Sequence, residues 1–161
     1  MKQFGMLIII LVLCLLNGCT PKDEAYLSNK DKQAITIEVN QALDVWMDSP
    51  KVGWIEHILS GMQLTDDFAM VSDGNILKGT NSIEQYMSES SQYVEYIANV
   101  QTPERYVNVL SRDVAMISLT FTEDVHLKSG DVHKSKGGFQ YVFKKIDNDW
   151  KVVGMAGTHI N

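Results

Sequence analysis

The sequence predicts an α+β fold: a cone-shaped, bent antiparallel sheet packed on three N-terminal helices, after a cleaved signal peptide. Apolar residues at helical three-and-four spacing are confined to about residues 28–90. From residue 106 onward, long runs rich in β-branched and aromatic residues alternate with short turn sequences. Helices followed by consecutive long strands are typical of an α+β domain with an antiparallel meander.

The chain begins with a segment typical of an export signal. Lys2 precedes an uncharged apolar run, residues 4–16, which is shorter than the roughly 20 residues that span a bilayer. The run ends in Leu16-Asn17-Gly18-Cys19, which resembles the lipobox of bacterial lipoproteins. This resemblance implies cleavage before Cys19 and attachment of acyl chains such as palmitate to it. The alternatives are cleavage at another position or a buried N-terminal helix.

The predicted organisation is a signal peptide over residues 1–18, a lipidated tether over 19–30 and one domain over 31–161. The expected location is the cell envelope, lipid-anchored in the outer membrane, with the membrane as partner. Residues 20–24, Thr-Pro-Lys-Asp-Glu, resemble the signal that exports Bacteroidota lipoproteins to the cell surface. A solvated spacer is the equal alternative.

Composition narrows the function classes. Of the two cysteines, Cys14 lies in the predicted signal and Cys19 would carry the lipid, so the mature chain would have no disulfide and no cysteine nucleophile. Loss of Lys2 changes the formal charge from −6 to −7, which argues against nucleic acid as a partner. No cofactor and no metal are expected.

The first helix is predicted from Ser28, an N-cap with Asp31 three residues later. Ser49 is the expected N-cap of a second helix, which begins at Pro50 and ends at Gly61. A third helix is expected after Asn81. The predicted buried positions are Ile35, Val39, Ala42, Leu43 and Trp46 in the first helix, Trp54, Ile55, Ile58 and Leu59 in the second, and Ile83, Tyr86 and Met87 in the third.

A short strand is expected around 68–72, followed by a turn at Asp73-Gly74. Four later strands are expected at 106–110, 114–126, 131–145 and 150–160. Pairing Lys128 with Asp131, and Glu123 with Lys136, makes favourable charge pairs at one hairpin tip.

The same register would place two apolar sets of this hairpin on opposite faces. One extra residue at Gly137-Gly138 brings Ile117, Leu119 and Phe121 onto one face with Phe139, Tyr141 and Phe143. The sequence therefore predicts a β-bulge at these glycines.

The domain resembles the nuclear transport factor 2-like (NTF2-like) superfamily, which includes SnoaL-like cyclases and ketosteroid isomerase. The resemblance spans about residues 31–160 and rests on four features. They are the first helix with its tryptophan, the short helix from Pro50, the stretch from 64 to 83, and the C-terminal stretch from 139 to 160 in which Trp150 opens the last strand. It implies a cone that encloses a pocket, and often a homodimer.

Ketosteroid isomerase uses an Asp base together with an oxyanion hole made of a Tyr and a protonated Asp in an apolar site. The resemblance implies a base near Ser72 or Asp73 and an oxyanion acid on the strand Phe139-Gln140-Tyr141, which has no carboxylate. This isomerase mechanism is therefore disfavoured, and Asp73 before Gly74 is first of all a turn residue.

The histidines give weak signals. His57 lies on the polar side of its helix and is expected to be solvated, and His126 and His133, expected opposite each other, lack the further ligands of a zinc site. A three-residue turn at 147–149 would place His159 at the pocket mouth, as a rim residue or a general acid or base. In that register Val153, Met155, Gly157 and His159 share a face with Tyr141 and Phe143.

Three functions remain. The favoured one is binding of a small apolar ligand by a membrane-tethered domain, without catalysis. The second is an isomerase, cyclase or dehydratase with His159 or Asp73 as weak catalytic candidates, and the third is a dimerisation or docking module that uses the outer sheet face. The expected ligand-binding residues are Trp54, Tyr86, Phe121, Phe139, Tyr141, Met155 and His159.

Overall fold

A computed structural model describes residues 27–160. The predicted signal peptide, Cys19 and the residues up to 26 lie outside the described range. The elements, in chain order, are α2 Asn29–Met47, α3 Trp54–Ser60, β1 Ala69–Ser72, β2 Asn75–Lys78, α4 Thr80–Ser90, β3 Val94–Val109, β4 Val114–Leu127, β5 Val132–Ile146 and β6 Asp149–His159.

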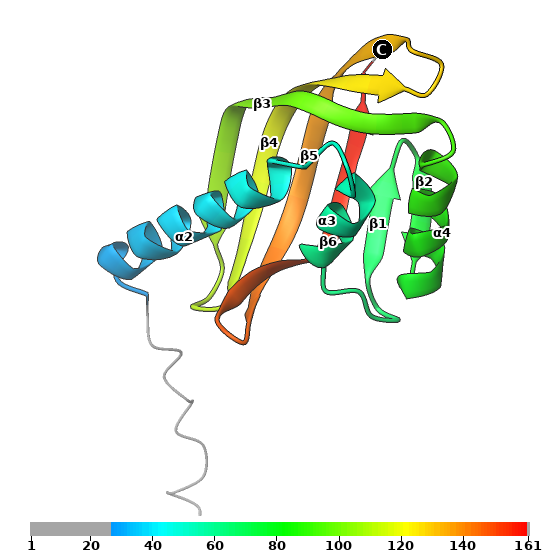
Figure 1. The fold of residues 1–161 in the computed structure, drawn as a ribbon. Helices are drawn as coiled ribbons and strands as arrows, with labels where there is room; N and C mark the ends of the chain where they lie inside the picture. The colour runs from blue at the N-terminus through cyan, green and yellow to red at the C-terminus, as the bar shows by residue number, and fades with distance from the viewer. Residues whose placement is uncertain (1–26, 161) are drawn as a thin grey trace, which may run out of the picture.

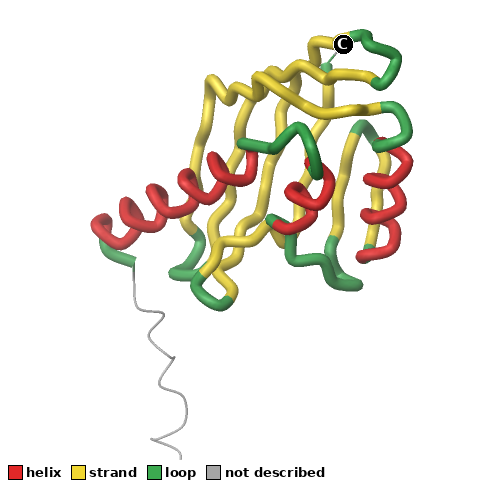
Figure 2. The backbone as a smooth tube through the Cα atoms, viewed as in Figure 1, coloured by secondary structure: helices red, strands yellow, loops and turns green. Residues whose placement is uncertain are grey.

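The predicted α+β architecture is confirmed: three helices pack on a curved sheet of six strands that is not closed into a barrel. The strand order is β2-β1-β6-β5-β4-β3, and β1 pairs with β6 in parallel while all other neighbours are antiparallel. All three helices lie on the same side of the sheet (Figures 1 and 2), which we call the inner face. No helix among residues 27–160 is long and apolar enough to cross a bilayer.

Helix α2 begins as predicted. Ser28 accepts a hydrogen bond from the Asp31 amide while the Asp31 carboxylate accepts one from the Ser28 amide, which completes a capping box. The predicted starts of the other two helices are wrong. Helix α3 begins at Trp54, and its N-cap is Gly53 with φ 75°. Helix α4 begins at Thr80, and its N-cap is Gly79 with φ 79°. Glycine in the left-handed region replaced the expected serine and asparagine caps.

The β-bulge predicted at Gly137-Gly138 is absent. Residues of β4 and β5 pair in one continuous register, with Leu119 opposite Phe139 and Glu123 opposite Ser135, not Lys136. The extra residue lies in the turn. Leu127 donates its amide to Asp131 across a three-residue loop in which Gly130 has φ 92°, so Lys128 does not pair with Asp131.

The predicted convergence of apolar residues on the inner face is nevertheless confirmed. Ile117, Leu119 and Phe121 lie opposite Tyr141, Phe139 and Gly137, and Phe143 lies opposite Ala115, so all six predicted side chains share the inner face. A three-residue turn and a two-residue turn followed by a bulge both shift the register by one residue relative to a plain two-residue turn. Both therefore place the apolar side chains of the two strands on the same face.

Between β5 and β6 the reverse holds: a predicted three-residue turn is replaced by a shorter turn and a bulge. The turn has two residues, Asp147 and Asn148, both at positive φ, and the extra residue appears further along the strand, where Val142 pairs with Gly154 but Phe143 with Val152. Val153 is therefore the unpaired residue, and Val152, fully buried, takes the inner position predicted for Val153. Met155, Gly157 and His159 keep the predicted face with Tyr141.

The core lies between α2 and the inner face. Its side chains with less than 2 % exposure include Leu43 and Val39 of α2 and Phe143, Ile117 and Val152 of the sheet. Trp46 is buried edge-on against Tyr141 at 5.1 Å between ring centroids and donates its indole N–H to the Ile58 carbonyl at 2.9 Å. Tyr86 is an exception to the predicted helix stripe, since it is 36 % exposed while Ile83 and Met87 are buried.

Candidate acid–base site

Asp73 occupies the first position of the tight turn between β1 and β2. It has φ 51° and is followed by Gly74 at φ 83°, a pair that suits a two-residue hairpin. Because β1 pairs in parallel with β6, with Ser72 opposite Gly157, the turn brings Asp73 beside the end of β6. The turn role predicted for Asp73 is confirmed, and the same turn presents its carboxylate to β6.

Four groups donate to the Asp73 carboxylate. The His159 backbone amide donates to Oδ1 at 2.7 Å, and His159 Nδ1 lies 2.8 Å from Oδ2. The Thr158 hydroxyl donates to Oδ1 and the Ser72 hydroxyl to Oδ2, each at 3.2 Å. The sequence offered Asp73 and His159 as separate weak candidates; the structure joins their side chains by a hydrogen bond.

These contacts set the protonation of the pair. Partial burial raises the pKa of Asp73, but the hydrogen bonds from the His159 amide and side chain, together with the His159 charge, outweigh it and leave the pKa below its ordinary value. Donation from Nδ1 to an ionised Asp73 makes Nε2 the proton acceptor of a neutral His159. The arrangement is that of a histidine oriented by an aspartate for proton transfer.

The His159 ring lies against two aromatic side chains of the inner face. Its centroid is 5.4 Å from that of Phe121 and 5.6 Å from that of Phe139, both at steep angles. Gly137 separates His159 from Phe121 in the ladder, and a Cβ there would come within 2.8 Å of the Phe121 ring. The missing side chain of Gly137 therefore lets the rings of β4 and β6 meet across β5.

Glu123 adds a second carboxylate that sequence reasoning missed as a site residue. It is two residues beyond Phe121 on β4 and so shares the inner face. Burial raises its pKa above the ordinary value, while the His159 charge and a hydrogen bond from Ser135 oppose the rise. The alternation that placed Phe121 on the inner face also indicated Glu123, but its assignment to a tip pair with Lys136 hid that signal.

Tyr141 contributes a phenol to the same face. It is 5 % exposed and stacks on Phe139 with 5.7 Å between centroids. Burial raises the pKa of its hydroxyl strongly, and the negative charge of Glu123 raises it further. Tyr141 therefore stays protonated at all physiological pH values.

The other predicted ligand-binding residues are dispersed. Met155 pairs with Tyr141 and is partly buried on the inner face, and Trp54 is a buried core residue at the start of α3. Tyr86 lies exposed on α4. The ligand-binding role of these residues stays a prediction.

The remaining histidines take other places. His57 is not simply solvated, because its Nε2 lies 3.2 Å from the Val45 carbonyl and 3.1 Å from that of Trp46, in the last turn of α2. His133 pairs with Val125 and His126 with Val132, so the two histidines point to opposite faces, and His126 stacks on Tyr96. Residues 27–160 contain no group of three side chains suited to a metal ion.

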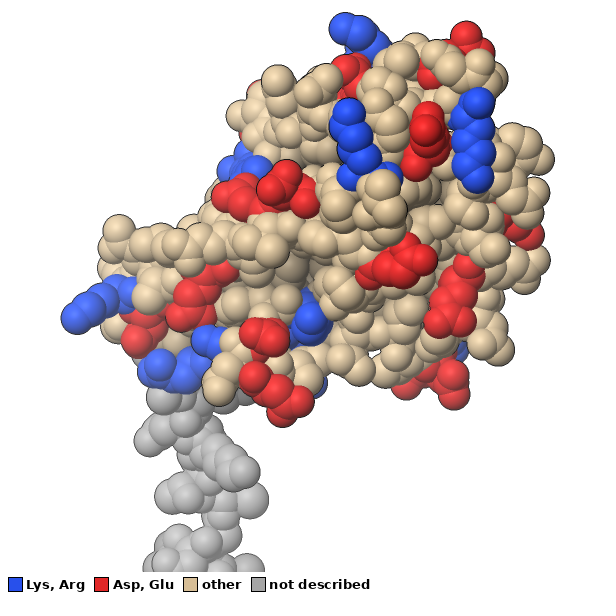
Figure 3. Space-filling view, viewed as in Figure 1, with Lys and Arg blue, Asp and Glu red and all other residues tan. Residues whose placement is uncertain are grey.

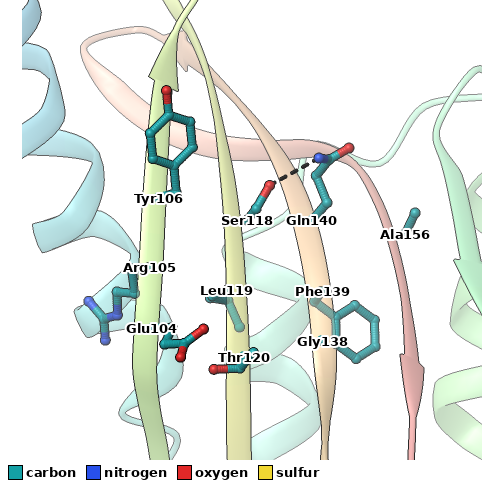
Figure 4. A pocket seen from close by; sticks show the side chains of 10 residues that line it. All are labelled: Glu104, Arg105, Tyr106, Ser118, Leu119, Thr120, Gly138, Phe139, Gln140 and Ala156. Carbon is teal, nitrogen blue, oxygen red and sulfur yellow. Dashed lines mark hydrogen bonds between the residues drawn. The ribbon is translucent and has the colours of Figure 1, made fainter.

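A shallow groove also crosses the outer face of the sheet. Figure 4 shows Tyr106, Ser118, Gln140 and Ala156 along it, one from each of the strands β3 to β6, with Gln140 donating to Ser118 at 3.0 Å. Its side chains are mostly small or polar. The face shown in Figure 3 mixes acidic and basic side chains.

The fold is similar to that of several solved structures. The chain is similar to a ketosteroid isomerase-like protein from Erwinia carotovora atroseptica (16 % identity, 78 % of this chain and 95 % of that chain, TM-score 0.62). It is also similar to a proposed dehydratase of the NTF2-like family from Streptomyces avermitilis (17 %, 80 % and 97 %, TM-score 0.67). A third neighbour is a proposed scytalone dehydratase from Novosphingobium aromaticivorans (8 %, 83 % and 89 %, TM-score 0.69).

These likenesses show the NTF2-like fold. At such identities they do not carry an activity over to this chain. No family model matches the sequence, and no curated protein matches it.

Proposed function

We propose that the domain is an acid–base enzyme of the isomerase or dehydratase kind, which moves a proton on a small, largely apolar molecule held against the inner face. The Asp73–His159 pair carries this proposal. His159 Nε2 would take or give the proton, and ionised Asp73 would hold the ring in the required tautomer.

Two further groups support an enzyme over a passive binder. Glu123 and Asp73 have pKa values displaced in opposite directions, and such divergence between two carboxyl groups is typical of sites that assign separate acid and base roles. The Tyr141 hydroxyl stays protonated and can donate a hydrogen bond, so it could stabilise a negative charge that develops on a substrate oxygen. The same fold occurs in a ketosteroid isomerase-like protein and in two proposed dehydratases, so it can house chemistry of this class.

The test is proton exchange on a simple carbon acid. Full-length protein in detergent micelles should accelerate the exchange of the C1 protons of 2-tetralone in D2O, followed by 1H NMR, above the rate with empty micelles. His159→Gln should abolish the acceleration. Asp73→Asn should reduce it by about 10²–10⁴-fold, because an amide orients the wrong tautomer.

Asp67→Asn is the matched control, since Asp67 is an exposed carboxylate outside the pair, and it should exchange like the wild type. Equal exchange by the wild type and His159→Gln would refute catalysis by this pair. Binding of 2-tetralone without any exchange would instead support the second candidate, a ligand-binding domain, which the apolar rings of Phe121, Phe139 and Tyr141 favour.

We propose in addition that the mature protein is a lipoprotein of the cell envelope, anchored through Cys19. The lipobox-like end of the apolar run supports this. Two or three acyl chains would hold the domain firmly at a membrane surface, since each buried CH2 contributes about 0.8 kcal/mol.

Cys19→Ala should release the protein into the soluble fraction and abolish labelling by an alkynyl palmitate analogue, both measured after membrane fractionation. Cys14→Ala is the matched control, because Cys14 lies in the segment that would be removed. Unchanged membrane association of Cys19→Ala would contradict the lipid anchor.

A further inference from the structure

The inner face carries an unbalanced charge at the proposed site. On the helix side of the sheet, Arg105 forms an ion pair with Asp44 of α2 at 2.6 Å, and Lys145 forms one with Glu38 of α2 at 2.8 Å. These two cations are therefore neutralised by the helix. Near the site Asp73 contacts the His159 side chain directly, and the charge of His159 also acts on Glu123. Lys134 and Lys136 line a pocket together with Glu123, but they pair with Asp124 and Thr122 and therefore alternate onto the outer face.

We propose that Glu123 determines specificity by charge: the site accepts flat, hydrocarbon-rich molecules whose polar group is neutral or cationic, and rejects those whose polar group is a carboxylate. This inference rests on the proposed function, because it describes what the same site admits. Asp73 is exposed and held by four donors, whereas Glu123 is half-buried and lies directly opposite Ser135 in the ladder.

The geometry explains why the filter would act on the polar end of a ligand. A flat ring stacked along Phe121 and Phe139 would have its edge near both His159 and Glu123, which flank Phe121 along and across the strands. An anionic group there would meet the Glu123 carboxylate in a partly desolvated place, where like charges repel more strongly than in water. A neutral amide or an amidinium would meet a hydrogen-bond acceptor instead.

Three planar probes of equal shape separate these cases: 2-naphthamide, 2-naphthamidine and 2-naphthoate. Binding is measured by isothermal titration at pH 8 to full-length protein in lipid nanodiscs, with empty nanodiscs subtracted. We expect the amide and the amidine to bind and the carboxylate to bind at least about tenfold more weakly. In Glu123→Gln the carboxylate should come within about threefold of the amide.

Asp124→Asn is the matched control, because it removes the same charge from the adjacent residue on the opposite face. It should leave the discrimination intact. Ser135→Ala keeps the Glu123 charge and removes the Ser135 hydroxyl, so it should also bind the carboxylate more weakly than the amide. This variant replaces Glu123→Gln in the test if Glu123→Gln does not fold.

The outcomes are distinct. Equal affinity of amide and carboxylate in the wild type would overturn the charge filter and leave the proposed function standing. If Glu123→Gln and Asp124→Asn reduced the affinity difference between 2-naphthamide and 2-naphthoate equally, the role of Glu123 would be overturned. No binding of any of the three probes would overturn the proposed function and this inference with it.

Discussion

Gly137→Ala should destabilise the domain by about 3 kcal/mol, the upper part of the usual range for overpacking a core. A Cβ at Gly137 would lie 2.1 Å from the Thr158 carbonyl oxygen, which is backbone and cannot swing away, and 2.8 Å from the Phe121 ring. Urea denaturation followed by circular dichroism measures the effect. The same change should separate Phe121 from His159 and so weaken the site.

Gly138→Ala is the matched control. Its Cβ would lie 3.5 Å from the Leu119 carbonyl oxygen, an ordinary contact on the outer face, so we expect a change below about 0.5 kcal/mol. A bulge was predicted at both glycines, but neither has a positive φ, and only Gly137 lacks room for a Cβ. Equal stability of the two variants would contradict the packing described for Gly137.

Trp46→Ala should cost about 3–5 kcal/mol of unfolding free energy, as expected for removal of a buried large aromatic side chain. The indole packs edge-on against Tyr141 and Phe143 and covers Gly61, where a Cβ would lie within 2.2 Å of the ring. Its loss also leaves the Ile58 carbonyl without its donor. Denaturant midpoints measure the difference.

Val45→Ala provides the comparison, because Val45 is adjacent on α2 but 69 % exposed. We expect it to change stability by less than about 0.5 kcal/mol. A loss for Trp46→Ala as small as that for Val45→Ala would show that the indole is not the link between α2, α3 and the sheet.

Much of the fold was predictable because the relevant signals are local. The Ser28–Asp31 capping box and the alternation of Ile117, Leu119 and Phe121 are read directly from spacing. Turn lengths were not predictable in the same way, because a three-residue turn with Gly130 and a two-residue turn with a later bulge satisfy the same apolar pattern. Charge pairing at the exposed tip is too weak to choose between them.

The site was only partly predictable for a different reason. Asp73 and His159 are 86 residues apart, and only the parallel pairing of β1 with β6 brings them together. Neither residue has a local pattern that indicates the other. Glu123, by contrast, lay within reach of the alternation rule and was missed because its charge suggested a partner on the neighbouring strand.

The displaced pKa values also predict opposite contributions to stability. The lowered pKa of Asp73 means that its contribution is present above the pKa of unfolded Asp, about 3.9, and is lost as the pH falls through its lower folded value. The raised pKa of Glu123 means that its ionisation opposes folding, so its penalty disappears as the pH falls through its folded value and below about 4.3, the value in the unfolded chain.

The most direct test of the acid–base site is a titration of both carboxyl groups by 13C NMR in the full-length protein. We expect the pKa of Asp73 to lie below its ordinary value and that of Glu123 above it, because His159 donates to the first carboxylate and burial dominates at the second. In His159→Gln the pKa of Asp73 should rise and that of Glu123 should rise further, since both lose the same positive charge. Ordinary pKa values for both groups, unchanged by His159→Gln, would contradict a site in which these three residues act together.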